Sequence, residues 1–366
     1  MAETLSMCDD DILIQQLLQL RPMELLGKYR YTEDPEQLLR PVRSPGELEQ
    51  LFHLAKQYGI DLESGMPGDL RQRPVFSEVV TENHSIHELL DISADLHPRY
   101  IGNAPHCHDY YELVYVCCGS VSQRLGADAL QMTAGDLCIL CPGASHDILA
   151  VCDDDLVLTI RMRRTVFDQA FFQTFSEDEM LQGYFREILY GRTAAPYLLL
   201  HTGEDREIRH ICLNMYRETV HVRNYSRACL NVQACMLFIR LLRDHGDQMV
   251  IGNQCDLFQN AAAFQILQYI RTHADRVTLE MVAQEFHYHP AYLSRTFRRV
   301  FGYSFAELRA EFRMTKAKEL LRSTTLPCAE MVGYQSASHF FRLFQKRFGV
   351  SPQTCRGQQG DRESKV

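Results

Sequence analysis

The chain of 366 residues is predicted to have a mixed α and β fold, with a strand-rich N-terminal part flanked by helices and an all-α C-terminal domain. Three observations support this prediction. Apolar residues alternate with a period of two between about residues 75 and 164, which is typical of strands. Apolar stripes of helical period lie on both sides of that segment. A short helical pattern then occurs twice between Thr278 and Gly349, and the total length is that of two or three domains.

Short apolar runs and glycine-containing turns define the strand-rich segment. The runs are Leu113–Cys118, Leu137–Cys141 and Leu156–Ile160, with turns at Gly119, Gly126 and Gly135. Many short strands with regular turns predict a sandwich or a barrel.

Helical patterns occupy the regions before and after these strands. Residues 1–72 are expected to form a helical extension that packs against the next domain or against a second subunit. Residues 165–245 are expected to be helical again, with a strongly apolar side over Arg227–Leu242. Residues 246–261 are polar and are interpreted as a linker to the C-terminal domain.

The C-terminal pattern AYLSRTFRRVFGYS at residues 291–304 is repeated as SHFFRLFQKRFGVS at residues 338–351. The equivalent positions are Arg295 and Arg342, Phe297 and Phe344, Phe301 and Phe348, Gly302 and Gly349, and Ser304 and Ser351. Each copy has one apolar stripe and ends at a glycine, which suits a helix that stops with positive φ. Two copies are too few for a solenoid, so they indicate a duplicated module.

A second helix precedes the first copy. Thr278 is a suitable N-cap for this helix, and Pro290 suits the first position of the helix that follows. The turn between them is expected at residues 287–289. A helix, a tight turn and a second helix form the helix-turn-helix plan, in which the second helix enters the major groove of DNA.

Polar and basic side chains are predicted on the exposed faces of the two repeated helices. The candidate DNA-binding residues are His289, Tyr292, Ser294, Arg295, Arg298 and Arg299 in the first copy and Ser338, His339, Arg342, Gln345 and Lys346 in the second. A solvated basic helix face is the alternative interpretation. Residues 290–350 contain 11 Lys and Arg against 4 Asp and Glu, although the whole chain has a net charge of −9. A basic block on an acidic chain favours nucleic-acid binding.

Residues from about Phe264 to Arg356 resemble the DNA-binding domain of the AraC/XylS family of bacterial transcription regulators. The resemblance is carried by Thr278-Leu279, Tyr292 to Arg295, Phe301 to Ser304, Leu320-Leu321, Val332 to Tyr334 and Phe348 to Pro352. It implies two helix-turn-helix units, within residues 262–356, joined by a long helix over Ser304–Ser323. It also implies that the helical region before the linker makes a dimer contact.

One departure from the family concerns the second unit. The segment from Leu321 to Val332 is about three residues shorter than is usual in the family, which leaves a first helix of barely six residues beginning at Pro327. Ala329 can still fill the small-residue position under the reading helix. Because the first helix of such a unit braces the reader, the first unit is expected to read DNA more effectively than the second.

A group of histidines stands within the strand-rich segment. His106, His108, Tyr110, Glu112 and the later His146 resemble the two motifs of the cupin barrel, which is thus expected over residues 73–164. The leading glycine of the first motif and the closing Asn of the second (Ala150 here) are missing. The resemblance implies that His106, His108, Glu112 and His146 could hold a divalent metal. Binding of a small polar effector by the same five residues is preferred, and a structural role for the histidines is a further alternative.

These observations favour a transcription regulator controlled by a small-molecule effector, such as a sugar, over an enzyme. The alternatives are a metal-dependent cupin isomerase or dioxygenase fused to a DNA-binding domain, and a DNA-binding protein without an effector. The expected partners are double-stranded DNA, the effector and a second copy of the chain, with RNA polymerase open as a further partner and no cofactor. The acidic N-terminus, the absence of a long apolar run and 13 scattered cysteines predict a cytoplasmic protein that does not contact a membrane.

Overall fold

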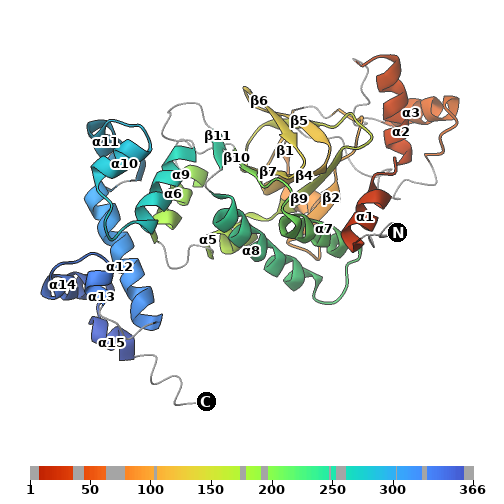
Figure 1. Cartoon of the computed structure of the whole chain (residues 1–366). Helices are drawn as coiled ribbons and strands as arrows, with labels where there is room; N and C mark the ends of the chain where they lie inside the picture. The colour runs from red at the N-terminus through yellow and green to blue at the C-terminus, as the bar shows by residue number, and fades with distance from the viewer. Residues whose placement is uncertain are drawn as a thin grey trace, which may run out of the picture. The chain divides into compact units, whose positions relative to one another are not determined.

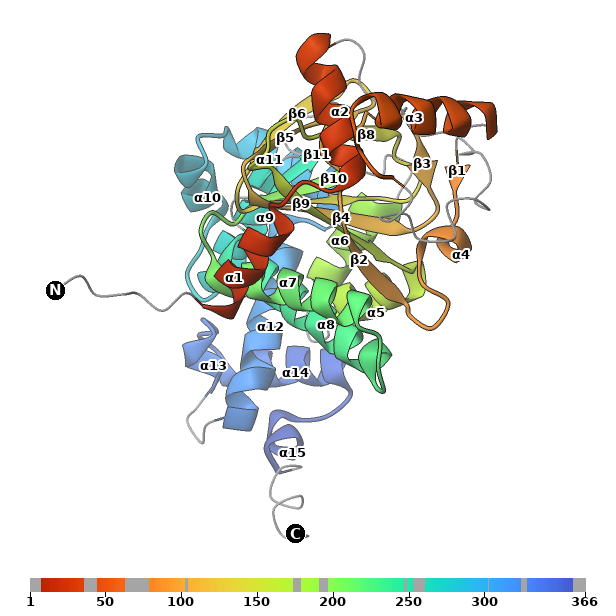
Figure 2. The same ribbon diagram turned by 90° about the vertical axis from the view of Figure 1, so that its right-hand side faces the viewer.

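The computed structural model describes residues 8–35, 45–62, 79–102, 105–173, 179–190, 197–246, 249–252, 261–301, 303–323 and 328–357. The chain divides into two compact units (Figures 1 and 2). We call residues 1–174 with 195–252 the sheet domain, and residues 175–194 with 253–366 the helical unit. Each unit is described separately below.

Three sheets make up the centre of the sheet domain. A six-stranded antiparallel sheet has the order β11-β10-β7-β4-β9-β2, a three-stranded sheet has the order β6-β5-β8, and β1 pairs with β3. The strands are β1 (Val79–Val80), β2 (Ile92–Leu96), β3 (Cys107–His108), β4 (Tyr111–Cys118), β5 (Ser120–Leu125), β6 (Asp128–Thr133), β7 (Asp136–Leu140), β8 (His146–Leu149), β9 (Leu156–Met162), β10 (Tyr197–His201) and β11 (Val250–Gly252). The predicted strand-rich segment is therefore confirmed.

An apolar core joins the six-stranded and the three-stranded sheets. Side chains from β4, β7 and β9 pack there with side chains from β5, β6 and β8, and Val114, Leu125 and Ile148 are examples. Residues at even spacing along a strand share a face, so every second residue of β4 and β5 faces this core. Cys138 of β7 is a buried free thiol in this core, and Cys141, directly after β7, is also free and buried.

Helices cover the other face of the six-stranded sheet. The helices α5 (Arg164–Gln173), α7 (Arg206–Val220) and α8 (Ser226–Asp244) pack on one another, and α7 and α8 pack on β2. Tyr111 of β4 points to this side and stacks on Phe167 of α5, with ring centroids 3.6 Å apart. The alternation of β4 thus places Tyr111 under the helices and Glu112 on the core side.

Two strands lie in regions where we predicted none. β10 falls within the expected helical region 165–245 and pairs with β7, and β11 falls within the expected linker 246–261 and pairs with β10. A four-residue apolar run such as Tyr197–Leu200 in β10 has no periodicity that separates a buried strand from a helix, so only the pairing with β7 identifies it as a strand. Most of the remaining linker, residues 253–260, lies outside the described residues.

The N-terminal helices α1 (Asp9–Leu17), α2 (Pro22–Glu33) and α3 (Pro45–Gln57) form the extension, and α4 (Glu82–Ser85) follows β1. Arg99 fixes α2 to the sheets, because its Nε donates to Oε1 of Glu24 over 3.1 Å and both side chains are almost fully buried. Arg99 Nη1 also donates to the carbonyl of Leu18 over 2.9 Å. The extension therefore packs against its own domain.

The helical unit contains α6 (Glu179–Tyr190), α9 (Ala261–Thr272), α10 (Leu279–Glu285), α11 (Pro290–Phe301), α12 (Phe305–Ser323), α13 (Cys328–Met331), α14 (Ala337–Phe348) and α15 (Pro352–Gly357). Figure 1 shows the long α12 with the pair α10–α11 at one end and the pair α13–α14 at the other. α6, which we expected with the connecting helices, belongs to this unit and contacts α11. Among the described residues, no helix combines the length and apolar character needed to span a bilayer.

Candidate functional site

The first helix pair has the local features that the sequence predicted. The Thr278 hydroxyl caps α10 by accepting a hydrogen bond from the backbone N–H of Met281 over 3.2 Å. The turn that follows contains His287 with φ of 57°, a left-handed conformation that lets the chain reverse over few residues. α11 then buries Leu293 and Phe297 completely. The other side of α11 is therefore turned outward.

The candidate residues of α11 lie mainly on this outer side. Ser294, Arg295 and Arg298 are exposed and Tyr292 is half-buried, and His289 is exposed in the turn just before α11. Nε of Arg295 donates to the carbonyl of Ala291 on the same helix over 3.3 Å, so its guanidinium is directed along the helix surface. Arg298 lies 3.8 Å from the carboxylate of Glu307 on α12, a surface pair of small energetic value. The side chain of Arg299 lies outside the described part of the chain.

The second helix pair keeps the same arrangement despite its short first helix. α13 has four residues, fewer than the six expected from Pro327, and residues 324–327 lie outside the described ranges. Ala329 packs in one apolar cluster with Phe340 and Phe344 of α14, as its predicted position required. Gly349 ends α14 with φ of 72°, again as predicted. The short α13 therefore still supports α14.

The candidate residues of α14 are all exposed. They are Ser338, His339, Arg342, Gln345 and Lys346. Their opposite face buries Phe340 and Phe344. The two repeated helices thus present equivalent polar and basic faces, each opposite a buried apolar stripe.

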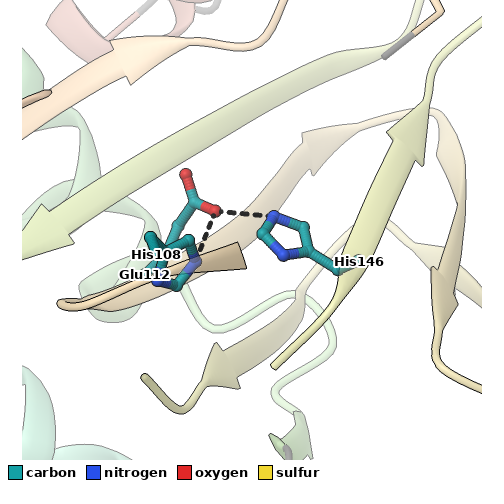
Figure 3. A group of neighbouring side chains, drawn as sticks. All are labelled: His108, Glu112 and His146. Carbon is teal, nitrogen blue, oxygen red and sulfur yellow. Dashed lines mark ion pairs between the residues drawn. The ribbon is translucent and has the colours of Figure 1, made fainter. Parts of the chain in front are cut away.

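A second site lies in the sheet domain, where His108, Glu112 and His146 meet (Figure 3). Oε2 of Glu112 lies 3.1 Å from Nε2 of His146 and 3.4 Å from Nε2 of His108, and all three residues are buried. Nδ1 of His108 contacts the carbonyl oxygen of Tyr110 at 2.7 Å, and Nδ1 of His146 contacts that of Ala144 at 3.3 Å. These backbone contacts direct both Nε2 atoms toward the carboxylate.

Charge within this group is compensated internally. Burial on its own would raise the pKa of Glu112, but hydrogen bonds and positive charge from His108 and His146 lower that pKa below its usual range. Burial would lower the pKa of His146, and the Glu112 carboxylate raises it instead. Glu112 is therefore ionised at neutral pH and stabilises a proton on the neighbouring imidazole.

The two remaining predicted residues lie beside this group. The ring of His106 packs on that of His146 with centroids 4.4 Å apart, and the ring of Tyr110 stacks on that of His108 at 4.2 Å. The even spacing of His106, His108, Tyr110 and Glu112 would suit one continuous strand, in which all four side chains share a face. The chain instead bends at residues 109–110 between β3 and β4, and this bend together with β8 brings the five side chains to one place.

The donor set of this group also suits a divalent metal ion. The ligand atoms of His108, Glu112 and His146 lie within 4.8 Å of one another. In this group the Nδ1 atoms of two imidazoles face backbone carbonyls, and a carboxylate lies between their Nε2 atoms. Proteins use this arrangement to bind zinc or iron. The same group can equally hold the polar atoms of a small organic molecule.

Sequence reasoning missed two buried polar residues between the sheets. Gln123 of β5 is fully buried, and His97, directly after β2, is 8% exposed. Gln123 interrupts an apolar alternation formed by Val121 and Leu125 in β5, which was the available signal. His97 has no motif around it, and only the fold places it near the others.

Comparison with known proteins supports both parts of this description. A family model described as a helix-turn-helix domain matches residues 282–358. A model described as an AraC-like ligand binding domain matches residues 95–194. The first range covers the second half of α10 together with α11, α13 and α14, and the second range includes the histidine group.

Three curated relatives are similar to this chain. The uncharacterized HTH-type transcriptional regulator YisR of Bacillus subtilis is 30% identical over 115 residues, which are 29% of this chain and 40% of that protein. The arabinose operon regulatory protein of Escherichia coli is 37% identical over 94 residues, which are 24% of this chain and 32% of that protein. The HTH-type transcriptional activator RhaR of Pectobacterium atrosepticum is 26% identical over 288 residues, 72% of this chain and 89% of that protein.

The match to YisR thus spans well under half of that relative, whereas the match to RhaR spans most of both chains. The matched family consists of transcription regulators and not of enzymes, so the enzymatic alternative is set aside. With a helix-turn-helix domain at its C-terminal end and an AraC-like ligand binding domain before it, the chain belongs to the AraC family of transcriptional regulators.

Proposed function

We propose that the chain recognises specific double-stranded DNA through α11 and α14, and that a small polar molecule bound in the sheet domain controls this recognition. The observation that carries the proposal is the pair of equivalent basic faces on α11 and α14. Each face stands opposite a buried apolar stripe in a helix-turn-helix unit. Such a helix reads base edges with its outer side chains.

The side chains on these faces have the required chemistry. Arg295 can donate two hydrogen bonds to guanine, and Ser294 and Tyr292 can reach base edges or phosphates from the same surface. On α14, Arg342 and Gln345 are the equivalent candidates. Two reading helices in one chain would meet successive major-groove faces about one turn, or ~34 Å, apart.

The support for an effector comes from the buried group in the sheet domain. His108, Glu112 and His146 form a buried charged cluster. Well-packed apolar residues at these positions would often stabilise the fold as well or better, so stability alone does not explain the cluster. His106 and Tyr110 add stacking surface to it. A small polar molecule, with a sugar as the first candidate, would bind these five side chains. The effector changes DNA binding only if its affinity differs between two arrangements of the protein.

Selection of binding sites from a random DNA library by the purified full-length protein tests the DNA part. We expect one preferred motif with two segments about one helical turn apart. Arg295→Ala should cost about 1–3 kcal/mol of binding free energy and relax preference at one base pair. Arg206→Ala, which removes an exposed arginine of α7 in the sheet domain, is the matched control. Recovery of no motif would overturn the proposal.

Thermal unfolding with a panel of sugars and related metabolites tests the effector part. A bound compound should raise the unfolding temperature of the wild type and not that of a His108→Ala variant. Metal analysis of the same protein is the complementary measurement. Stoichiometric zinc or iron that is lost in the His108→Ala variant would contradict direct contact between these side chains and the effector.

A further inference from the structure

Gln123 is a buried amide for which the described residues supply no partner. Its side chain is fully buried in β5, and neither Oε1 nor Nε2 has a hydrogen-bond partner. A primary amide can accept two hydrogen bonds and donate two. Leaving such a group unpaired in a protein interior costs about 1–3 kcal/mol, so a molecule outside the fold is expected to pair with it.

The position of Gln123 is fixed by the strand. Val121 and Leu125, two residues before and after it, belong to the apolar core between the six-stranded and the three-stranded sheets. Gln123 shares their face and is directed between the sheets. Gln131, opposite Ser122 on the neighbouring strand β6, shows the contrast, because it is exposed and its Nε2 donates to the Ser122 hydroxyl.

His97 reaches the same place from the other sheet. Its ring makes a hydrogen bond to the backbone of Ile148, and Ile148 is the residue of β8 that stands opposite Gln123. Nε2 of His97 is buried and has no hydrogen-bond partner among the described residues. Burial lowers the pKa of His97 to about 4. The ring is therefore neutral at pH 7, and Nε2 is an acceptor when Nδ1 carries the proton.

We propose that Gln123 and His97 together hold one hydroxyl group of the ligand, and that they select a neutral, hydroxyl-bearing molecule. This inference rests on the proposed effector function of the sheet domain. A hydroxyl group can donate its proton to Nε2 of His97 and accept a hydrogen bond from Nε2 of Gln123. The hydroxyl thus supplies a hydrogen-bond partner to two side chains that the protein leaves unpaired, one from each sheet.

The neutral His97 ring argues against an anionic ligand. A ligand carboxylate beside Gln123 would face the lone pair on the unpaired Nε2 of His97. Burying such an unpaired charge costs far more than burying a hydroxyl that finds two partners.

Gln123→Met tests this assignment, because methionine has nearly the same shape without the amide. The probes are neutral polyols (L-arabinose, D-xylose, L-rhamnose and myo-inositol) and two anions of similar size, gluconate and galactarate. Binding to the full-length protein is measured by calorimetry, and stability is measured by thermal unfolding without ligand. Gln131→Met is the control, since it makes the same chemical change on the exposed surface of β6.

We expect a neutral polyol to bind the wild type and Gln131→Met equally, and to bind Gln123→Met at least tenfold more weakly. Without ligand, Gln123→Met should unfold at the same or a higher temperature, because it removes an unpaired buried amide. Gln123→Leu repeats the measurement if Gln123→Met does not fold.

Three results would overturn the inference. Unchanged binding by Gln123→Met would mean that the amide does not contact the ligand. A clear loss of stability without ligand would mean that the amide already has a structural partner, such as a buried water. Binding of only the anions, or of none of the probes, would exclude the proposed ligand class. The DNA selection described above remains an independent test of the regulatory function.

Discussion

Arg313 in α12 donates a hydrogen bond from Nη2 to the backbone carbonyl of Asp275 over 2.5 Å, and Nε donates to the adjacent carbonyl of Ala274 over 2.6 Å. Its guanidinium also lies 5.3 Å from the centre of the Tyr334 ring. Ala274 and Asp275 precede the first helix-turn-helix unit, and Tyr334 follows α13 in the second. One buried side chain therefore links both units, and it helps to set the spacing of α11 and α14.

Replacing Arg313 tests this linking role. Arg313→Met leaves two carbonyl oxygens without their donor, so the free energy of unfolding of the helical unit should fall by about 1–3 kcal/mol. DNA binding should weaken on every sequence without a change in the preferred motif. Urea unfolding and library selection measure these effects. Lys316→Met on the same helix is the control, and equal effects of both changes would contradict the linking role.

Gly333 makes the matching contact from the second unit. Its φ is +84°, and a Cβ atom built there would lie 2.1 Å from the carbonyl oxygen of Asp275. Gly333→Ala therefore adds a backbone clash to the conformational strain of about 1–2 kcal/mol, for a total of roughly 3 kcal/mol. Gly349→Ala has a similar φ of +72° with no atom within 4 Å, so it should cost only the strain. Equal losses in urea unfolding would show that the Asp275 contact carries no energy.

The contrast between these glycines shows what the sequence could predict. The role of Gly349 follows from local signals, because it directly follows an apolar helical stripe, and the N-cap Thr278 was predicted for the same reason. The contact of Gly333 with Asp275 joins residues far apart in the chain. No local pattern encodes it.

The same distinction holds in the sheet domain. Spacing alone brought attention to His108 and Glu112, but the packing of the His106 ring on the His146 ring depends on an isolated bridge between these two residues. Gln123 carries a weak local signal as a polar residue in an apolar alternation. His97 carries none, because its partner Ile148 belongs to a different sheet.

Acid should weaken the sheet domain through Glu24. Burial would raise the pKa of this carboxyl, but hydrogen bonds from Arg99 and Arg21 lower it to about 2 from an ordinary value of 4.5. A carboxyl whose folded pKa is lowered stabilises the fold above pH 4.5, and this contribution is lost as the pH falls toward 2. At about 1.4 kcal/mol per pKa unit, it amounts to roughly 3 kcal/mol at neutral pH.

The comparison of wild type with Glu24→Gln isolates this contribution. The difference in the free energy of unfolding, followed by circular dichroism in urea, should be large at pH 7 and should shrink between about pH 4.5 and 2. Glu49→Gln, which removes an exposed carboxylate of α3, should show no such dependence. A difference between wild type and Glu24→Gln that stays constant over this range would refute the assignment.

We propose that a stripe of exposed residues on α8 binds a second copy of the chain. Val232, Met236 and Ile239 are 60%, 47% and 43% exposed, and Cys229 is also exposed. Positions 229, 232, 236 and 239 alternate by three and four residues, which is the spacing of a seam between two packed helices. The opposite face of α8 buries Leu230, Leu237 and Leu241 within the sheet domain, so this stripe is left for a partner helix.

Met236→Glu should therefore weaken self-association of the full-length protein at least tenfold, because it places a charge in the centre of the seam. Sedimentation under reducing conditions, which exclude a disulfide through Cys229, measures the monomer fraction against concentration. Leu89→Glu makes the same kind of change at a residue that is 69% exposed outside α8, and it should leave association unchanged. If both variants associate like the wild type, the second copy binds elsewhere. If Met236→Glu is monomeric, it should also bind an operator with two half-sites more weakly than the wild type does, because the DNA-binding units of two copies are then no longer linked.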